Sequence, residues 1–277
     1  MALRPFVAVV GLVLIPAGIA SARLPAPPTT GDAKSGGEAA RFIPRSVLFG
    51  NPERAGVRVS PDGQRLSWLA PVDGVLNLWV APVDHPDQAK AVTSDKGRGI
   101  RSYNWAYTNK DILYTQDVGG DENWKVFRVN LETGEVKDLT PFSEIKGPDG
   151  KPLMLPSGKP MRPAARIQEA SPDHPGHVLL ALNNRNPQWH DLYRVDIATG
   201  AMDLVMQNDE GFAGYVTDNN FNVRFGAKSL PDGGMETQRY VAKDDGKGAW
   251  EGFMKVGMED AQNTSVAGLD RAGTTLY

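Results

Sequence analysis

The histidines are the first side chains to consider for chemistry, because an imidazole can act as a general base near neutral pH or bind a metal ion. The sequence has four, His85, His174, His177 and His190, and each lies in or beside a turn rich in Pro or Asn. Only geometry identifies a catalytic triad, so we expect exposed turn residues here. His174 and His177 are three apart, but the Pro-Gly pair between them forbids the helix on which that spacing would bind metal. We therefore predict no metal site and no cofactor.

No activated nucleophile can be identified in the sequence either. The motif G-x-S-x-G, which places a serine on a strained turn between a strand and a helix, does not occur in it. Nor does the sequence show the alternation of strands and helices that builds a parallel sheet. We predict no catalytic residues, and we expect the chain to be inactive alone.

The acidic turn "GGDENW" is the sharper candidate for a site. Asp121 and Glu122 are adjacent and Asn123 follows them. One interpretation is a solvated turn in which the Asp and Asn side chains bond their own backbone. The other is a weak substrate-binding site made of Asp121, Glu122 and Asn123, and both interpretations stay open at this point.

These turns belong to a repeated unit. Strand pairs around a polar turn recur as "RLSWLAPVDGVLNLWVAPV", "DILYTQDVGGDENWKVFRVNL" and "HVLLALNNRNPQWHDLYRVDI", in which Leu78, Val126 and Leu192 fall at matching places. Another strand precedes each pair, and a shorter one follows it, twice after "ETGE" or "ATGA". A period of 46 to 65 residues is typical of propeller repeats, and the Pro, Gly and Lys-rich insertion 145–163 explains the long interval.

The repeat predicts an all-β fold, a β-propeller. A fourth, less regular unit begins at "AGYVTDNNF", and a fifth begins at "SVAGLDRAGTTLY". We therefore expect about four four-stranded blades plus the start of a fifth, that is, an open partial propeller. Because every turn between second and third strands should fall on one face, we expect a shared rim. Its predicted members are Asp73, Asp121, Glu122, Asn123, Asn184, Arg185 and Asn186.

Composition sets the class of protein. The 277 residues are 40% hydrophobic and carry a net charge of −3, so the chain can form a core and offers no basic face to a nucleic acid. The 30 Gly and 21 Pro favour many short strands joined by tight turns. No cysteine is present, so packing alone must hold the fold together.

The N-terminus is predicted to be a signal peptide over 1–22. An apolar run from Phe6 to Ile19 is followed by Ala20 and Ala22 at the positions that signal peptidase prefers. The alternative is an uncleaved membrane anchor, which the Pro and Gly residues of the run disfavour. We expect a flexible leader over 23–41, a propeller domain over 42–277, only transient contact with the membrane, and a periplasmic or secreted protein.

The stretch "IPRSVLFGNPERAGVRVSPDGQRLSWLAPVDGVLNLWV", together with "GGDENWKVFRVNLETGE" and "NNRNPQWHDLYRVDIATG", resembles the N-terminal propeller of bacterial serine peptidases of the prolyl oligopeptidase family. The resemblance is to the dipeptidyl or acylaminoacyl peptidase type. It implies a propeller that caps an α/β-hydrolase domain bearing a Ser-Asp-His triad. It also implies that acids projecting from the propeller hold the free amino terminus of a peptide substrate.

The resemblance implies a non-catalytic, substrate-gating portion of an exported peptidase. Since no hydrolase domain can be identified in the sequence, we expect a truncated or partial chain whose peptide substrate is bound through that missing domain. The alternative is a self-sufficient periplasmic propeller, similar to TolB, that binds protein or cell-wall partners. An open reading frame continuing into G-x-S-x-G after Tyr277 would favour the peptidase.

We predict that signal peptidase cleaves after Ala22, so that the exported protein begins at Arg23. Mass spectrometry of the N-terminal peptide, purified from the secreted or periplasmic fraction, measures this directly. An exported form that still carries Met1 would contradict the prediction.

Overall fold

The structure is a computed structural model that describes residues 43–242 and 248–277. The predicted signal peptide 1–22, with Ala20 and Ala22, and the predicted leader 23–41 lie outside these residues. The chain divides into two compact units, 1–50 and 51–277. The described part of the first contains the short helix α1 (Arg45–Phe49), whose first turn is closed by bonds from the amides of Val47 and Leu48 to the carbonyl of Pro44.

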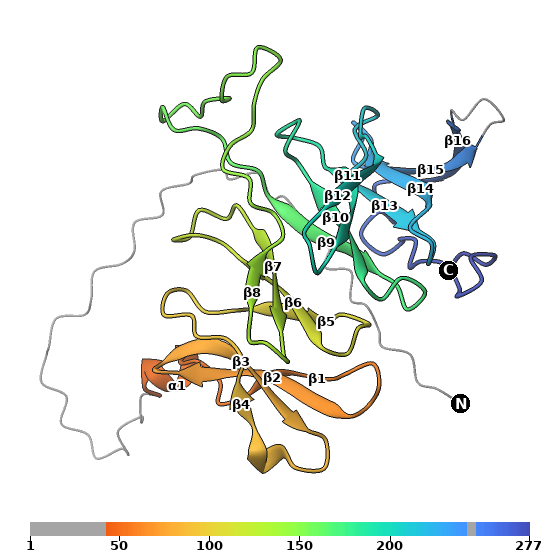
Figure 1. The fold of residues 1–277 in the computed structure, drawn as a ribbon. Coiled ribbons are helices and arrows are strands. Elements are labelled where there is room, and N and C mark those ends of the chain that lie inside the picture. The colour runs from red at the N-terminus through yellow and green to blue at the C-terminus, as the bar shows by residue number, and fades with distance from the viewer. Residues whose placement is uncertain (1–42, 243–247) are drawn as a thin grey trace, which may run out of the picture. The chain divides into compact units, whose positions relative to one another are not determined.

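The second unit is built from sixteen strands in four antiparallel sheets of four, within the residues described (Figure 1). In each sheet the strands follow chain order. The first contains β1 (Ala55–Val59), β2 (Arg65–Val72), β3 (Val75–Pro82) and β4 (Lys90–Ala91), with the 3-10 turn η1 (Pro86–Gln88) before β4. The second contains β5 (Ser102–Trp105), β6 (Asp111–Gln116), β7 (Lys125–Asn130) and β8 (Val136–Asp138). The third contains β9 (Ala165–Ala170), β10 (His177–Leu182), β11 (Asp191–Asp196) and β12 (Met202–Met206). The fourth contains β13 (Gly214–Thr217), β14 (Val223–Ser229), β15 (Met235–Ala242) and β16 (Gly248–Val256).

These sheets are the blades that the repeat predicts, and the open partial propeller is confirmed. The start of a fifth blade is visible as a bridge between Leu269 and Leu276, extended by a bond from the amide of Ala267 to the carbonyl of Tyr277. No helix in the described residues is long and apolar enough to cross a membrane.

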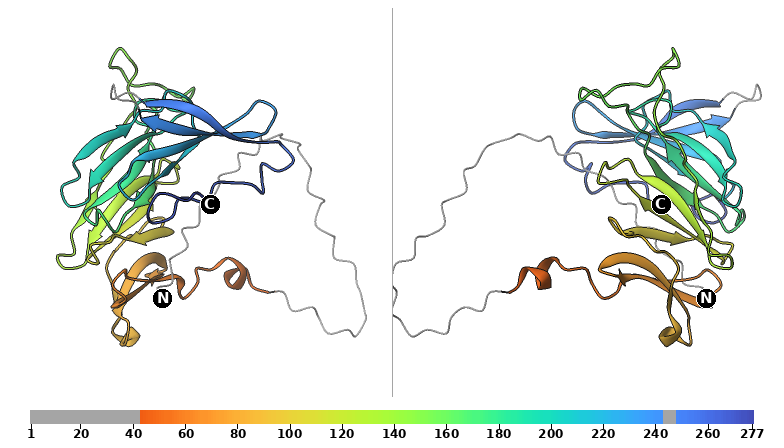
Figure 2. Two further views of the ribbon diagram at one scale, coloured as in Figure 1. Left: turned by 90° about the vertical axis from the view of Figure 1, so that its right-hand side faces the viewer. Right: turned by 60° about the vertical axis from the view of Figure 1, so that its left-hand side comes forward.

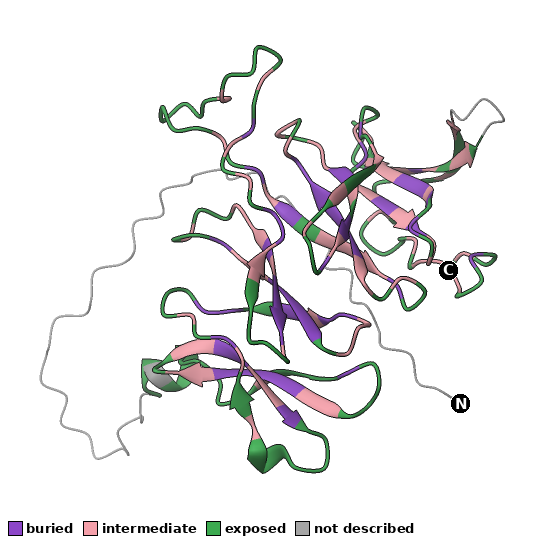
Figure 3. Cartoon of the chain, in the orientation of Figure 1, coloured by how far each residue is buried: buried purple, intermediate pink, exposed green. Residues whose placement is uncertain are grey.

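Successive blades pack face to face, as the two views of Figure 2 and the buried strands in Figure 3 show. Strand β10 illustrates this packing. On one of its faces Val178, Leu180 and Leu182 enter the core shared with the second blade. Leu179 and Ala181 on its other face enter the core shared with the fourth blade. A strand buried on both faces reads as a continuous apolar run, as "VLLAL" does. The positions matched by the repeat, Leu78, Val126 and Leu192, are all fully buried.

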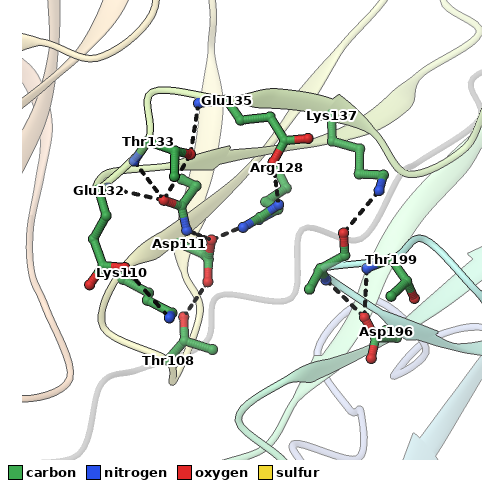
Figure 4. A network of polar contacts seen from close by, with 12 residues as sticks. Thr108, Lys110, Asp111, Arg128, Glu132, Thr133, Glu135, Lys137, Asp196 and Thr199 are labelled. Carbon is green, nitrogen blue, oxygen red and sulfur yellow. Dashed lines mark hydrogen bonds and ion pairs between the residues drawn. The ribbon is translucent and has the colours of Figure 1, made fainter.

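The turns use the chemistry that their residues dictate. Asp73 and Gly74 both have positive φ, 51° and 84°, as a two-residue hairpin turn requires between the paired residues Val72 and Val75. In the turn after β7, Asn130 Oδ1 accepts the amides of Glu132 and Thr133. After β11, Asp196 Oδ1 accepts the equivalent amides of Ala198 and Thr199 (Figure 4), so the "ETG" and "ATG" turns are true structural repeats.

The second blade also contains a buried ion pair. Arg128 Nε donates to Asp111 Oδ1 at 2.7 Å, and the two side chains are only 8% and 3% exposed (Figure 4). Asn130 Nδ2 donates to the same carboxylate oxygen, and Thr108 Oγ1 donates to the other one. The carboxylate therefore joins β6, β7 and the loop between the first two strands of the blade.

We predict that Asp111→Ala lowers the free energy of unfolding by about 3–5 kcal/mol, because it leaves the buried Arg128 with only the exposed Glu135 as a counter-ion and removes the acceptor that Asn130 and Thr108 share. The adjacent Lys110→Ala is the control, since Lys110 and its partner Glu132 are exposed and their pair is worth about 0–1 kcal/mol. Urea unfolding followed by tryptophan fluorescence measures both. Equal losses in the two variants would contradict the prediction.

Candidate functional site

The acidic loop, residues 117–124 between β6 and β7, has a tightly constrained backbone. Gly119 and Gly120 have φ of 66° and 85°, and Glu122 has φ of 55°, which is uncommon for a residue other than glycine. A Cβ added to Gly120 would lie 2.5 Å from Nη1 of Arg98, so the guanidinium packs directly on this glycine. The loop conformation thus requires glycine at the point where an arginine covers it.

The buried side chain of Asp117 fixes the conformation of the loop. This side chain is 2% exposed and pairs with Arg98, whose Nε lies 3.4 Å from Asp117 Oδ1. The other oxygen, Oδ2, accepts the backbone amide of Glu122 at 3.2 Å. This bond holds Glu122 in its left-handed conformation.

Asp121 bonds to other residues of the loop and also to a residue outside it. Its Oδ1 accepts the amides of Val118 and Asn123, and its carbonyl accepts Asn123 Nδ2 at 3.0 Å. Its Oδ2 lies 3.2 Å from Nη1 of Arg162. Partial burial opposes ionisation, but these hydrogen bonds and the guanidinium outweigh it and lower the pKa of Asp121. Asp121 and Asn123 therefore make the local bonds expected of a polar turn.

Glu122 differs from its neighbours. Within residues 43–242 and 248–277, its exposed carboxylate takes part in no hydrogen bond and no ion pair. The loop and its partners carry three carboxylates, Asp117, Asp121 and Glu122, and two guanidinium groups, Arg98 and Arg162. The local charge is thus −1, located on Glu122, which suits a ligand with one positive charge.

The other residues predicted to share a rim lie in the corresponding turns between the second and third strands of their blades. Their bonds are to residues outside the acidic loop. Arg185 makes a bidentate pair with Asp191 at 2.9 Å and also contacts Asp209. Asn184 accepts the hydroxyl of Tyr193. Asn186 accepts the amide of Gln188, and Asp73 lies in the hairpin turn of the first blade. No bond or ion pair of the described residues joins them to the acidic loop.

The histidines correct one expectation. His85 is exposed as predicted, but His174, His177 and His190 are half-buried. Burial, assisted by the nearby charge of Arg166, lowers the pKa of His190 to about 4. The prediction of exposed turn residues was wrong for these three, because tertiary packing that local sequence does not reveal partly buries them. His174, for example, packs against Phe221, which lies between β13 and β14 of the fourth blade.

The sequence interpretation also missed Arg98, Asp117 and Arg162. Asp117 directly follows the apolar strand β6, and this could have marked it as a buried acid. Arg162 lies 41 residues from its partner Asp121, and no local pattern links them.

Comparisons with known proteins identify sequence relatives of the chain. No family model matches the chain. It is 45% identical over 252 residues to dipeptidyl aminopeptidase BIII of Pseudoxanthomonas mexicana, a match covering 91% of this chain and 33% of that protein. It is 27% identical over 241 residues to dipeptidyl peptidase family member 6 of Caenorhabditis elegans, covering 85% and 31%. The predicted resemblance to prolyl oligopeptidase-family peptidases is confirmed. The chain spans about a third of the length of these relatives.

Several solved structures are similar at low sequence identity. TolB from Acinetobacter baumannii matches with a TM-score of 0.43 and 14% identity, over 71% of this chain and 43% of that one. An acylaminoacyl peptidase in complex with a chloromethyl ketone matches with a TM-score of 0.43 and 14% identity, over 77% and 33%. The propeller domain of the trilobed protease from Pyrococcus furiosus matches with a TM-score of 0.39 and 14% identity, over 77% and 59%.

Glu169 is a partly buried acid that makes no ion pair with the described residues. It lies on β9, the first strand of the third blade, and is half-buried. Burial raises the pKa of its carboxyl group to about 7, against the opposing effect of the Ala170 amide. The pKa of Tyr107 is also raised, first by burial of its phenol and second by the charge of Glu169.

The raised pKa of Glu169 predicts a pH dependence of stability. Between about pH 4.5 and pH 7 the folded chain holds a proton that the unfolded chain has lost, so stability falls as the pH rises through this window. We expect the wild type to lose up to about 3 kcal/mol relative to Glu169→Gln between pH 4.5 and 8. Urea unfolding of both proteins at several pH values measures the difference. A constant difference across this range would contradict the prediction.

Proposed function

We propose that the chain is the substrate-gating propeller of an exported peptidase, and that its acidic loop holds the free amino terminus of a peptide. The chemistry would come from an α/β-hydrolase domain acting with the propeller. The relation to a dipeptidyl aminopeptidase supports an amino-terminal substrate, since the name of that relative describes such an activity.

The free carboxylate of Glu122 carries the proposal. The other two acids of the loop are paired with arginines, whereas Glu122 is exposed and held in a fixed backbone conformation. An α-amino group has a pKa of about 8 and is mostly protonated at neutral pH. A charge-assisted hydrogen bond to Glu122 would therefore select peptides with an unblocked amino terminus.

The fixed conformation matters for gating. A residue whose backbone is already held in place loses less conformational entropy when a ligand binds, so more of the interaction contributes to affinity. An acid at a fixed position would also set how far a peptide can extend past the rim. We infer that this distance limits the substrate to short peptides.

We predict that Glu122→Gln weakens binding of alanyl-alanine amide by about 10-fold to 100-fold, the effect expected for a hydrogen bond to a charged group. Titration of the full chain at pH 6.5, followed by amide chemical shifts in NMR spectra, measures the affinity. Glu132→Gln is the matched control, because it removes one exposed carboxylate from a turn between β7 and β8.

N-acetylation of the ligand should abolish the interaction as fully as the substitution does. An acetylated ligand that binds the wild type as tightly as the free one would contradict the proposal. So would equal losses in Glu122→Gln and Glu132→Gln.

A further inference from the structure

The insertion, residues 145–163 between β8 and β9, has an ordered backbone of its own. Gly147 donates to the carbonyl of Lys151, and eight residues later Leu155 donates to that of Lys159, both at 2.8 Å. Three strand-like segments are joined in a ring, because Ile145 donates to Met161, Met161 to Leu153, and Leu153 to Ile145. The insertion is thus two equivalent turns on a closed base, and Figure 1 shows it projecting from the sheets.

The base of the insertion is fixed beside the acidic loop. Ile145 is 1% exposed, and Pro163 is buried. The next two amides are also held, since Ala164 donates to Asn183 Oδ1 at 2.6 Å and Ala165 donates to the carbonyl of Trp124 at 2.7 Å. Trp124 ends the acidic loop. Arg162 therefore stands on a rigid backbone directly next to the loop with which it pairs.

We propose that the insertion is a positioning element for the acidic loop and that Arg162 is its contact residue. By pairing with Asp121, Arg162 assigns the amine-binding role to Glu122 alone. This inference rests on the proposed function, and it gives the insertion a part in selecting a substrate with a single positive charge.

The contacts of Asp121 explain why Glu122 alone is left to bind the amine. Both of its carboxylate oxygens are occupied, Oδ1 by two loop amides and Oδ2 by Arg162. Without the guanidinium, Oδ2 would be free one residue before Glu122 and would compete for the ligand. Arg98 cannot replace Arg162 as the partner of Asp121, because its guanidinium is already paired with the buried carboxylate of Asp117.

The test compares Asp121→Asn in two backgrounds, wild type and Arg162→Gln, with alanyl-alanine amide as the probe. Asparagine keeps the oxygen that accepts the loop amides, so the substitution removes mainly the charge. In the wild type we expect Asp121→Asn to change the affinity by less than about threefold, and Glu122→Gln to weaken it by about tenfold or more. In the Arg162→Gln background we expect Asp121→Asn to become costly, by about fivefold or more, the non-additivity that marks coupled residues.

The pKa of Asp121, measured by carbon NMR of its carboxyl group, provides a readout independent of the ligand. It should rise in Arg162→Gln and stay low in Arg162→Lys, which keeps the positive charge. Lys151→Gln is the matched control, because it removes one charge from an 82% exposed side chain of the same insertion without touching the loop.

Each outcome decides between the alternatives. If Asp121→Asn costs as much as Glu122→Gln in the wild type, both carboxylates bind the amine and the inference fails. It also fails if Asp121→Asn remains silent in the Arg162→Gln background. If Glu122→Gln has no effect, the proposed function fails. In that case a pKa of Asp121 that rises in Arg162→Gln but not in Lys151→Gln would still support the positioning role, and an unchanged pKa would overturn it.

Discussion

The packing of each four-stranded sheet against the next is the constraint on which the rest of the structure depends. Three apolar cores lie between successive blades, and single strands contribute alternate residues to two of them, as β10 does. Because side chains alternate across a strand, a slip of one residue would exchange the two cores. The register of the buried strands, and with it the position of the turns that join them, is therefore fixed by burial on both faces.

This constraint is what makes a precise loop possible on a scaffold of short strands. The acidic loop receives its contacts from both neighbours along the chain: Arg98 comes from the segment before β5, and Arg162 from the segment before β9. A left-handed Glu122 costs conformational energy that these contacts must offset. The same arrangement pairs two of the three acids and leaves a single charge facing solvent.

The sequence predicts the parts of this account that depend on local chemistry. Alternating apolar runs, the Asp73-Gly74 turn and the repeated "ETG" and "ATG" turns identify the blades, because each follows from the geometry of strands and tight turns. The contacts of Arg162 depend on two segments brought together by packing, and no local signal encodes them. The half-buried state of His190 and Glu169 has the same origin, since tertiary packing buries positions that look exposed in the chain.

In the proposed complex one carboxylate, Glu122, binds the amino terminus of a peptide while Asp121 stays paired with Arg162. A crystal structure of the chain with alanyl-alanine amide tests this most directly. The account predicts the ligand nitrogen within hydrogen-bond distance of the Glu122 carboxylate, with the pair between Asp121 and Arg162 intact. A ligand bound away from the acidic loop, or held equally by both carboxylates, would contradict it.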